Sequence, residues 1–196
     1  MKQIGQKIVN IINSGGVGIL PTDTLYGLVG SALNRKAVER INKVKRRGPK
    51  KPFIILISGI KDLELFGVEA DIKTKNILSR FWPGSVSIVL KCPKLEKEMS
   101  YLQPLNKTLA FRCPEERWLN VLLEKTGPLV APSANPEGLS VAETIKQAKK
   151  YFGGRIDFYV EGGILKGAPS TLISLESGNV EILRKGNVKI SNNRVM

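Results

Sequence analysis

The sequence contains no histidine, and this absence excludes more kinds of chemistry than any other feature of its composition. A Ser-His-Asp triad, a Cys-His pair and a histidine zinc site all need an imidazole, so the chain can form none of them. Catalysis would therefore have to depend on positioning and charge, on a metal held by oxygen ligands, or on the substrate itself.

Cysteine is scarce, and long hydrophobic runs are absent. Cys92 and Cys113 are the only cysteines among 196 residues and neither lies in a CxxC motif, so we expect small buried side chains at strand ends and no disulfide framework. No segment approaches the roughly twenty apolar residues of a membrane helix, and residues 1–7 lack the apolar core of a secretory signal. The sequence predicts a soluble, cytoplasmic protein with no membrane partner.

Two common nucleotide-binding motifs are also missing. The sequence has no GxGxxG that opens a helix and no GxxxxGK[ST] loop, because Ala168 stands where that loop would have its lysine. A bound nucleotide would have to be held in another way.

Positive charge, in contrast, is abundant. The formal net charge is +14, and removing the six basic residues between positions 43 and 51 leaves +8, so the excess is general. Five of those six lie in the ten residues 44–53, which have three interpretations: a solvated face, a nucleic-acid patch, or a grip on a phosphorylated small molecule. A positive field attracts polyanions without selecting among them, so RNA and nucleotides both remain possible.

Hydrophobic periodicity predicts one α/β domain over residues 1–196, with a twisted mixed sheet covered by helices. Helices are expected near 4–12, 35–45, 70–81, 115–125 and 140–151. Strands are expected at 17–20, 53–57, 86–90, 108–112, 129–131, 156–160, 171–175 and 180–183, the last two joined as a hairpin.

Polar loops follow several of these strands. Pro21–Leu28, with two hydroxyls, a carboxylate and a phenol, is interpreted either as a ligand-binding loop at a strand end or as a simple turn. Ser133 and Asn135 lie between two prolines that restrict the backbone, which favours a binding role over turn formation alone. The glycine-rich residues 162–171 are interpreted first as a flexible surface loop.

Two arginines, Arg112 and Arg184, each end a predicted strand. An arginine at a strand end is usually solvated or paired. If the two converged on one cleft, their guanidinium groups would suit a carboxylate or a phosphate.

Seven motifs occur in one order along the chain: PTDTLYGL, Lys45-x-Arg47 with Lys51-Pro52, Trp82-Pro83-Gly84, Thr108 to Arg112, Pro132-Ser133-Ala134-Asn135, Ser170-Thr171, and Ile182-Leu183-Arg184. Together they resemble the YrdC/TsaC family of threonylcarbamoyl-adenylate synthases, in its single-domain form, over about residues 5–186. The resemblance implies a YrdC-like fold and a nucleotidyltransferase that converts L-threonine, bicarbonate or CO2, and ATP into threonylcarbamoyl-adenylate and pyrophosphate. That product serves N6-threonylcarbamoyladenosine modification of tRNA through a separate downstream transferase.

The resemblance also implies roles for individual residues. Thr24, Arg112 and Ser170 would bind threonine. Arg47, Lys51, Thr108, Ser133, Asn135 and Arg184 would bind ATP, with Lys45 and Arg47 as the catalytic pair and Mg²⁺ entering with the nucleotide and not through protein ligands. The sequence departs from the family pattern at Glu137 and Val141, where relatives often have serine, and at Leu56, where some have histidine.

Two alternative functions remain. One is an RNA-binding or ribosome-associated protein on the same fold, suggested by the net charge, although the basic run has no interleaved aromatic residues. The other is a paralogue that acts on a different carbamoyl-adenylate.

Overall fold

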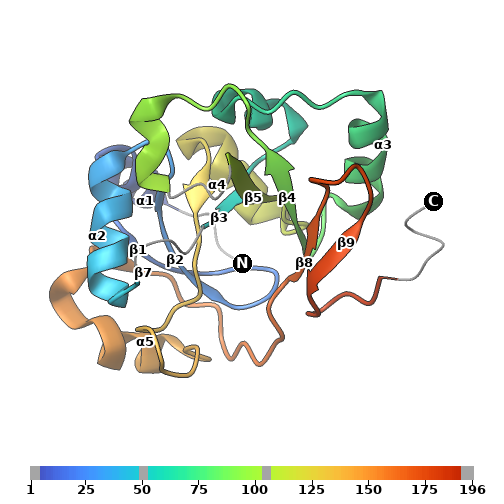
Figure 1. Cartoon of the computed structure of the whole chain (residues 1–196). Coiled ribbons are helices and arrows are strands. Elements are labelled where there is room, and N and C mark those ends of the chain that lie inside the picture. Colours follow the sequence, from blue (N-terminus) through green and yellow to red (C-terminus); the bar gives the residue numbers. More distant parts are fainter. Residues whose placement is uncertain (1–4, 49–52, 103–106, 191–196) are drawn as a thin grey trace.

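The computed structural model describes residues 5–48, 53–102 and 107–190, and Figure 1 shows its course. Nine strands form within these residues: β1 (Gly18–Pro21), β2 (Tyr26–Ser31), β3 (Ile54–Leu56), β4 (Val86–Lys91), β5 (Thr108–Arg112), β6 (Leu129–Val130), β7 (Phe158–Tyr159), β8 (Thr171–Ser174) and β9 (Glu181–Arg184). The helices are α1 (Gln6–Asn13), α2 (Arg35–Lys45), α3 (Ile72–Phe81), α4 (Arg117–Thr126) and α5 (Ile145–Phe152), with 3-10 turns η1 (Ile60–Phe66), η2 (Lys97–Leu102) and η3 (Gly153–Arg155).

The strands form one mixed sheet in the order β7-β1-β2-β6-β3-β5-β4-β8-β9. Three pairs are parallel, β1 with β7, β3 with β5 and β4 with β8, and the remaining neighbours are antiparallel. The predicted mixed sheet with helices is therefore confirmed. Among the described residues, no helix combines the length and the apolar character needed to cross a membrane.

Two apolar clusters lie on opposite faces of the sheet, because successive strand residues alternate between faces. Ile55 belongs to the larger cluster, which also takes in the buried sides of α2, α3 and α5. Leu56, its neighbour in the chain, belongs to the smaller cluster with α1 and α4. Cys92 and Cys113 are buried in the larger cluster, directly after β4 and β5, as expected.

Side-chain caps define several helix starts. Asn34 accepts a hydrogen bond from Ala37 N at 3.1 Å and so starts α2, which has the predicted bounds. Thr144 does the same for α5 through Gln147 N at 3.2 Å. This cap places the start of α5 at Ile145, so the prediction of a helix from residue 140 was too long.

The sequence pattern did not indicate β2, which we had expected to be part of a loop. Glycine inside a strand weakens the usual signal and often marks a close approach of another element. A side chain at Gly30 would lie 3.2 Å from Ile41 and 3.3 Å from Ala37, both on α2. The glycine therefore lets α2 pack closely against β2. β1 and β2 form a β-hairpin in which Pro21 pairs with Tyr26, so residues 22–25 are its tip.

Candidate functional site

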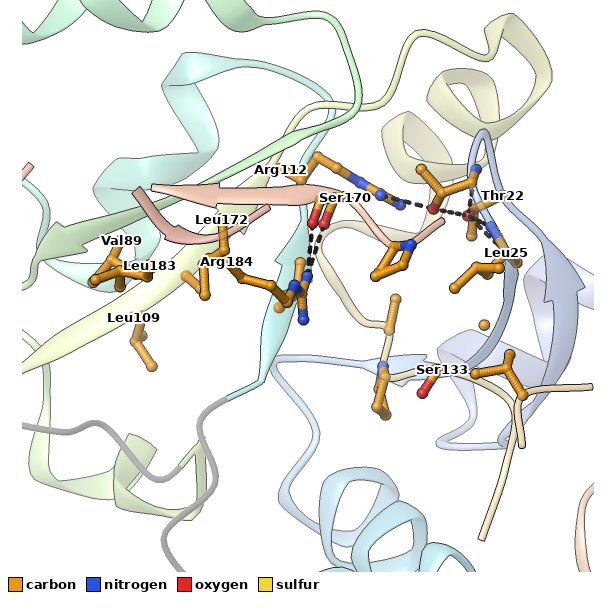
Figure 2. Close-up of a pocket in the computed structure, with 18 of the residues that line it drawn as sticks. Thr22, Leu25, Val89, Leu109, Arg112, Ser133, Ser170, Leu172, Leu183 and Arg184 are labelled. Atoms are coloured by element: carbon orange, nitrogen blue, oxygen red, sulfur yellow. Dashed lines mark hydrogen bonds between the residues drawn. The ribbon is translucent and has the colours of Figure 1, made fainter. Parts of the chain in front are cut away.

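Figure 2 shows residues that line a cavity of about 560 Å³. This cavity opens on the face of the sheet that also carries α1 and α4. Ile54 shows that the cavity and these helices share one face, because it lines the cavity and also packs against the apolar cluster under α1 and α4. The cavity therefore occupies a part of this face that α1 and α4 leave open. Its walls come from the β1–β2 turn, the end of β5, the loop after β6, the segment before β8, and β9.

The β1–β2 turn is organised by the hydroxyl of Thr22. This oxygen accepts from Thr24 N at 3.2 Å and from Leu25 N at 3.3 Å, and it donates to Leu25 O at 2.8 Å. The two interpretations of this segment are thus compatible, since Thr22 forms the turn while Thr24 faces the cavity.

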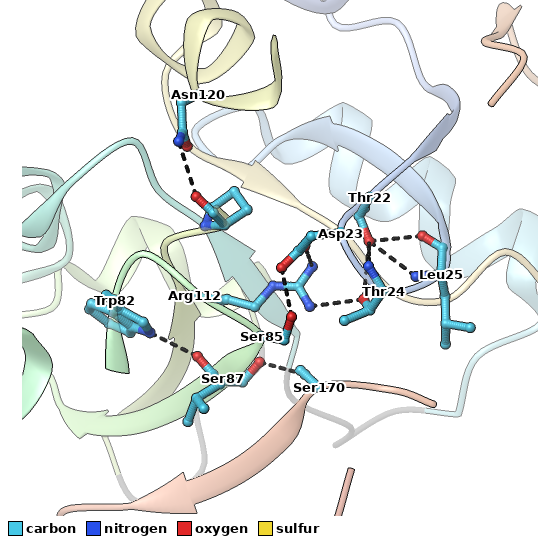
Figure 3. A network of polar contacts seen from close by, with 12 residues as sticks. Thr22, Asp23, Thr24, Leu25, Trp82, Ser85, Ser87, Arg112, Asn120 and Ser170 are labelled. Atoms are coloured by element: carbon cyan, nitrogen blue, oxygen red, sulfur yellow. Dashed lines mark hydrogen bonds and ion pairs between the residues drawn. The ribbon is translucent and has the colours of Figure 1, made fainter. Parts of the chain in front are cut away.

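Arg112, the last residue of β5, lies against this turn with only 5% of its side chain exposed (Figure 3). Its Nη1 donates to Thr24 Oγ1 at 3.0 Å, and its Nη2 lies 3.2 Å from Asp23 Oδ1. Ser85 Oγ in turn donates to Asp23 Oδ2 at 3.0 Å. The guanidinium is thereby fixed in orientation by Thr24 and Asp23 of the hairpin turn, and Ser85, from the loop before β4, holds Asp23.

The charge of Arg112 is only partly compensated. Burial lowers the pKa of this guanidinium, Asp23 opposes that shift, and the nearby positive charge of Arg184 adds to it. Its buried Nε has no hydrogen-bond partner among the described residues. An anion placed between Arg112 and Arg184 would relieve their repulsion.

Ser170 connects the strands at the other side of the cavity. Its hydroxyl lies 2.8 Å from Ser87 Oγ, and Arg184 Nη2 donates to Ser170 O at 2.8 Å and to Ser170 Oγ at 3.3 Å. These contacts hold the guanidinium of Arg184 over the cavity, although it belongs to the edge strand β9 (Figure 2).

Arg47 reaches the cavity just after the end of α2. Its guanidinium lies 4.9 Å from the centre of the Phe53 ring, a distance suited to a cation–π contact. Burial lowers the pKa of Arg47, and the negative charge of Glu137 raises it.

Lys45, unlike Arg47, does not line the cavity but lies against the loop after β6. Its side chain is buried, and Nζ donates to Ser133 O at 2.6 Å, Asn135 O at 2.6 Å and Asn135 Oδ1 at 3.2 Å. Ser133 Oγ also donates to Asn135 Oδ1 at 2.7 Å. Lys45 and Asn135 therefore brace the loop that presents Ser133 to the cavity.

The structure brings most of the predicted site residues together. Seven of them line the cavity: Thr24, Arg47, Thr108, Arg112, Ser133, Ser170 and Arg184. Lys45 and Asn135 lie behind the Ser133 loop, and Lys51 falls outside the described residues. Val141, one of the departures from the family pattern, also lines the cavity.

Sequence reasoning assigned no role to three polar residues beside the cavity. Asp23 lay inside a segment already singled out, but its pairing with Arg112 depends on the contact between distant strands. Ser85 and Ser87 follow the Trp82-Pro83-Gly84 motif. The only hint in the sequence of a special role for Ser87 was its position as a polar residue inside an otherwise apolar predicted strand.

No group of three or more His, Cys, Asp or Glu side chains that would suit a metal ion occurs in the part of the chain that the structure describes. Asp23, the buried carboxylate at the cavity, is engaged by Arg112. The cavity lining includes one carboxylate, Glu176, together with three arginines and several hydroxyl groups, and this set suits the anionic groups of a ligand better than a bare metal ion.

Comparison with known proteins gives a consistent result. A family model named Sua5_yciO_yrdC and described as "Telomere recombination" matches residues 10–186. The threonylcarbamoyl-AMP synthase of Pyrococcus abyssi is 33% identical over 91% of this chain and 53% of its own length, so the chain spans about half of that relative. A putative threonylcarbamoyl-AMP synthase of Methanocaldococcus jannaschii is 30% identical over 96% of this chain and 88% of its own.

A solved structure shows the same fold. The crystal structure of P. abyssi Sua5 complexed with L-threonine superposes with a TM-score of 0.83 at 31% identity. The match covers 92% of this chain and 53% of that one.

Proposed function

Because the chain belongs to the Sua5/YciO/YrdC family, we propose that it joins L-threonine, bicarbonate or CO2, and ATP into L-threonylcarbamoyl-adenylate and pyrophosphate. The observation that carries this proposal is the convergence of Arg112 and Arg184 on one cavity, where Thr24 and Ser170 present hydroxyls between them. The names of the relatives and the bound threonine of P. abyssi Sua5 support the choice of substrates.

Threonine is assigned to Thr24, Arg112 and Ser170. The hairpin turn and the Asp23 pair hold the Arg112 guanidinium in place, so it binds a carboxylate without having to reorganise. The hydroxyls of Thr24 and Ser170 supply neutral donors and acceptors for the polar groups of the amino acid.

ATP is assigned to Arg47, Thr108, Ser133 and Arg184, which line the neighbouring parts of the same cavity. Lys51 is assigned to ATP on the sequence motif. Lys45 and Asn135 act by holding the Ser133 loop. Mg²⁺ is proposed to enter with the nucleotide, held by phosphate oxygens, and to neutralise phosphate charge.

The reaction needs no protein nucleophile, which agrees with a chain that has no histidine. The amine of threonine and CO2 give a carbamate. A carbamate oxygen then forms a bond to the α-phosphorus, and the bond to the bridging oxygen breaks as pyrophosphate leaves with the electron pair. Alignment and charge neutralisation accelerate such a displacement, and the arginines of the cavity supply both.

The product is a labile mixed anhydride, and we propose that a separate transferase in the cytoplasm uses it to modify tRNA. Direct binding of RNA by this chain stays a prediction from the net charge. It is checked by titrating tRNA at increasing salt, because contacts to phosphates release counterions and weaken steeply with salt.

The test of the synthase is a reaction of the purified chain with ATP, Mg²⁺, L-threonine and bicarbonate. Pyrophosphate and threonylcarbamoyl-adenylate should form in equal amounts, and omission of any one substrate should abolish both. Pyrophosphate release that does not depend on threonine or bicarbonate would contradict the proposal. Replacing threonine by other amines distinguishes the synthase from a paralogue.

A further inference from the structure

Arg47 lies between two points at which Glu137 holds the main chain. The amide of Glu137 donates to Lys45 O at 2.8 Å, on one side of Arg47. On the other side, Gly48 N donates to Glu137 Oε2 at 2.8 Å. One residue of the loop after β6 therefore fixes the main chain on both sides of an arginine that lines the cavity.

One of these contacts satisfies a group that the end of a helix leaves open. The last carbonyls of an α-helix have no partner within the helix, and Lys45 O belongs to the last residue of α2. Arg46 follows with a left-handed backbone, φ 54°, and turns the chain out of the helix. The amide of Arg47 still donates to Asn42 O at 3.0 Å as part of this helix cap. Glu137 adds the contacts to the residues on either side, Lys45 and Gly48.

Charge acts in the same direction as these hydrogen bonds. Burial lowers the pKa of Arg47, and the carboxylate of Glu137 raises it, so Glu137 stabilises the charged guanidinium at the cavity wall.

We infer that Glu137 is a positioning residue for nucleotide binding, which acts by holding Arg47 where the terminal phosphates of ATP lie. The inference rests on the proposed function, in which Arg47 binds the triphosphate. Glu137 itself does not line the cavity and need not touch the substrate.

The experiment measures the affinity of the full chain for Mg-ATP and for AMP by calorimetry. AMP lacks the two terminal phosphates, so it reports on the rest of the nucleotide site without Arg47. Glu137→Ala should weaken Mg-ATP binding about fivefold and leave AMP binding within about twofold, since one solvent-accessible hydrogen bond and one charge are lost.

Two further variants separate the causes. Glu137→Gln keeps an acceptor for Gly48 N–H and loses the charge, so its Mg-ATP affinity should lie between those of wild type and Glu137→Ala. Glu124→Gln removes one negative charge from the exposed surface of α4 and should leave both affinities unchanged. It controls for the change in net charge.

Wild-type affinity for Mg-ATP in Glu137→Ala overturns the inference, and so does an equal loss for Mg-ATP and AMP, because a general disturbance of the loop would weaken both ligands. If Glu137→Gln binds Mg-ATP as weakly as Glu137→Ala does, the hydrogen bond to Gly48 N–H is not what positions Arg47, and this part of the inference is wrong. If the wild-type chain binds neither nucleotide, the proposed function itself is refuted.

Discussion

Asp23 Oδ1 lies 3.2 Å from Arg112 Nη2, and the two side chains are 7% and 5% exposed. The pair joins the tip of the β1–β2 hairpin to the end of β5, which are not neighbours in the sheet. It fixes the arginine at the cavity and partly compensates its charge, which burial disfavours. The pair therefore holds a residue that lines the cavity and ties the hairpin tip to the end of β5.

Asp23→Asn should reduce the free energy of unfolding by about 3 kcal/mol, because a buried guanidinium loses its counter-charge. Urea denaturation measures this change. Glu115→Gln, at an exposed position, serves as the control and should stay within about 0.5 kcal/mol of wild type. A fully stable Asp23→Asn protein would show that the pair contributes no net stability.

Arg47→Ala should lower kcat/KM for ATP about a hundredfold in the pyrophosphate assay, since one fixed cation is lost at the cavity. Lys43→Ala provides the matched control in the same basic segment, because Lys43 is exposed on α2, and its activity should stay within about threefold. Equal losses in the two variants would mean that the general positive field, and not Arg47, attracts the nucleotide.

Lys45→Met should destabilise the fold by about 2 kcal/mol and raise KM for ATP. The substitution keeps an unbranched side chain but leaves the carbonyls of Ser133 and Asn135 without their buried donor. Thermal unfolding and steady-state kinetics give the two readouts. If kcat falls and KM and stability do not change, Lys45 acts in the chemical step and not through the loop.

Gly167→Ala should raise KM for threonine with little effect on KM for ATP. A Cβ at this position would lie 2.5 Å from Thr24 O, so the β1–β2 turn or the glycine loop must shift. Gly154→Ala, where a Cβ meets no atom within 4 Å, is the control. An unchanged KM for threonine in Gly167→Ala would show that the β1–β2 turn and the loop that contains Gly167 can move apart without weakening threonine binding.

Both thiols should resist labelling in the native protein at pH 8. Burial raises the pKa of Cys92 to about 12 and that of Cys113 to about 11, so the reactive thiolate is scarce and access is closed. A chromogenic disulfide reagent should count no fast-reacting thiol before unfolding and two in denaturant. Fast reaction of one thiol without denaturant would locate a local opening of the larger apolar cluster.

Local signals were sufficient for much of the fold. The bounds of α2 and β5 agree with the sequence patterns, because α2 has a helical apolar periodicity and β5 is a short apolar run. β2 was missed because two glycines interrupt its pattern, and the sequence alone does not show that α2 packs against Gly30. α5 was predicted too long because the cap at Thr144 was overlooked.

The site residues likewise divide into those that local sequence motifs indicated and contacts that only the folded chain shows. Thr24 and Arg112 are 88 residues apart in the chain, and their side chains meet only because β3 pairs with β5 and the hairpin tip folds beside them. The partners of Asp23 and the supporting place of Lys45 could not be predicted, since both depend on contacts between elements remote in sequence.

By itself, the sequence determined what kind of chemistry is available. It has no imidazole, it is rich in cations, and its ordered motifs indicated the family before any fold was known. Only the tertiary structure decided which cations face the cavity and which support its walls. The reason is physical: residue type sets the charge and the hydrogen-bonding groups of a side chain, whereas the pairing of distant strands sets where that side chain points and which groups it contacts.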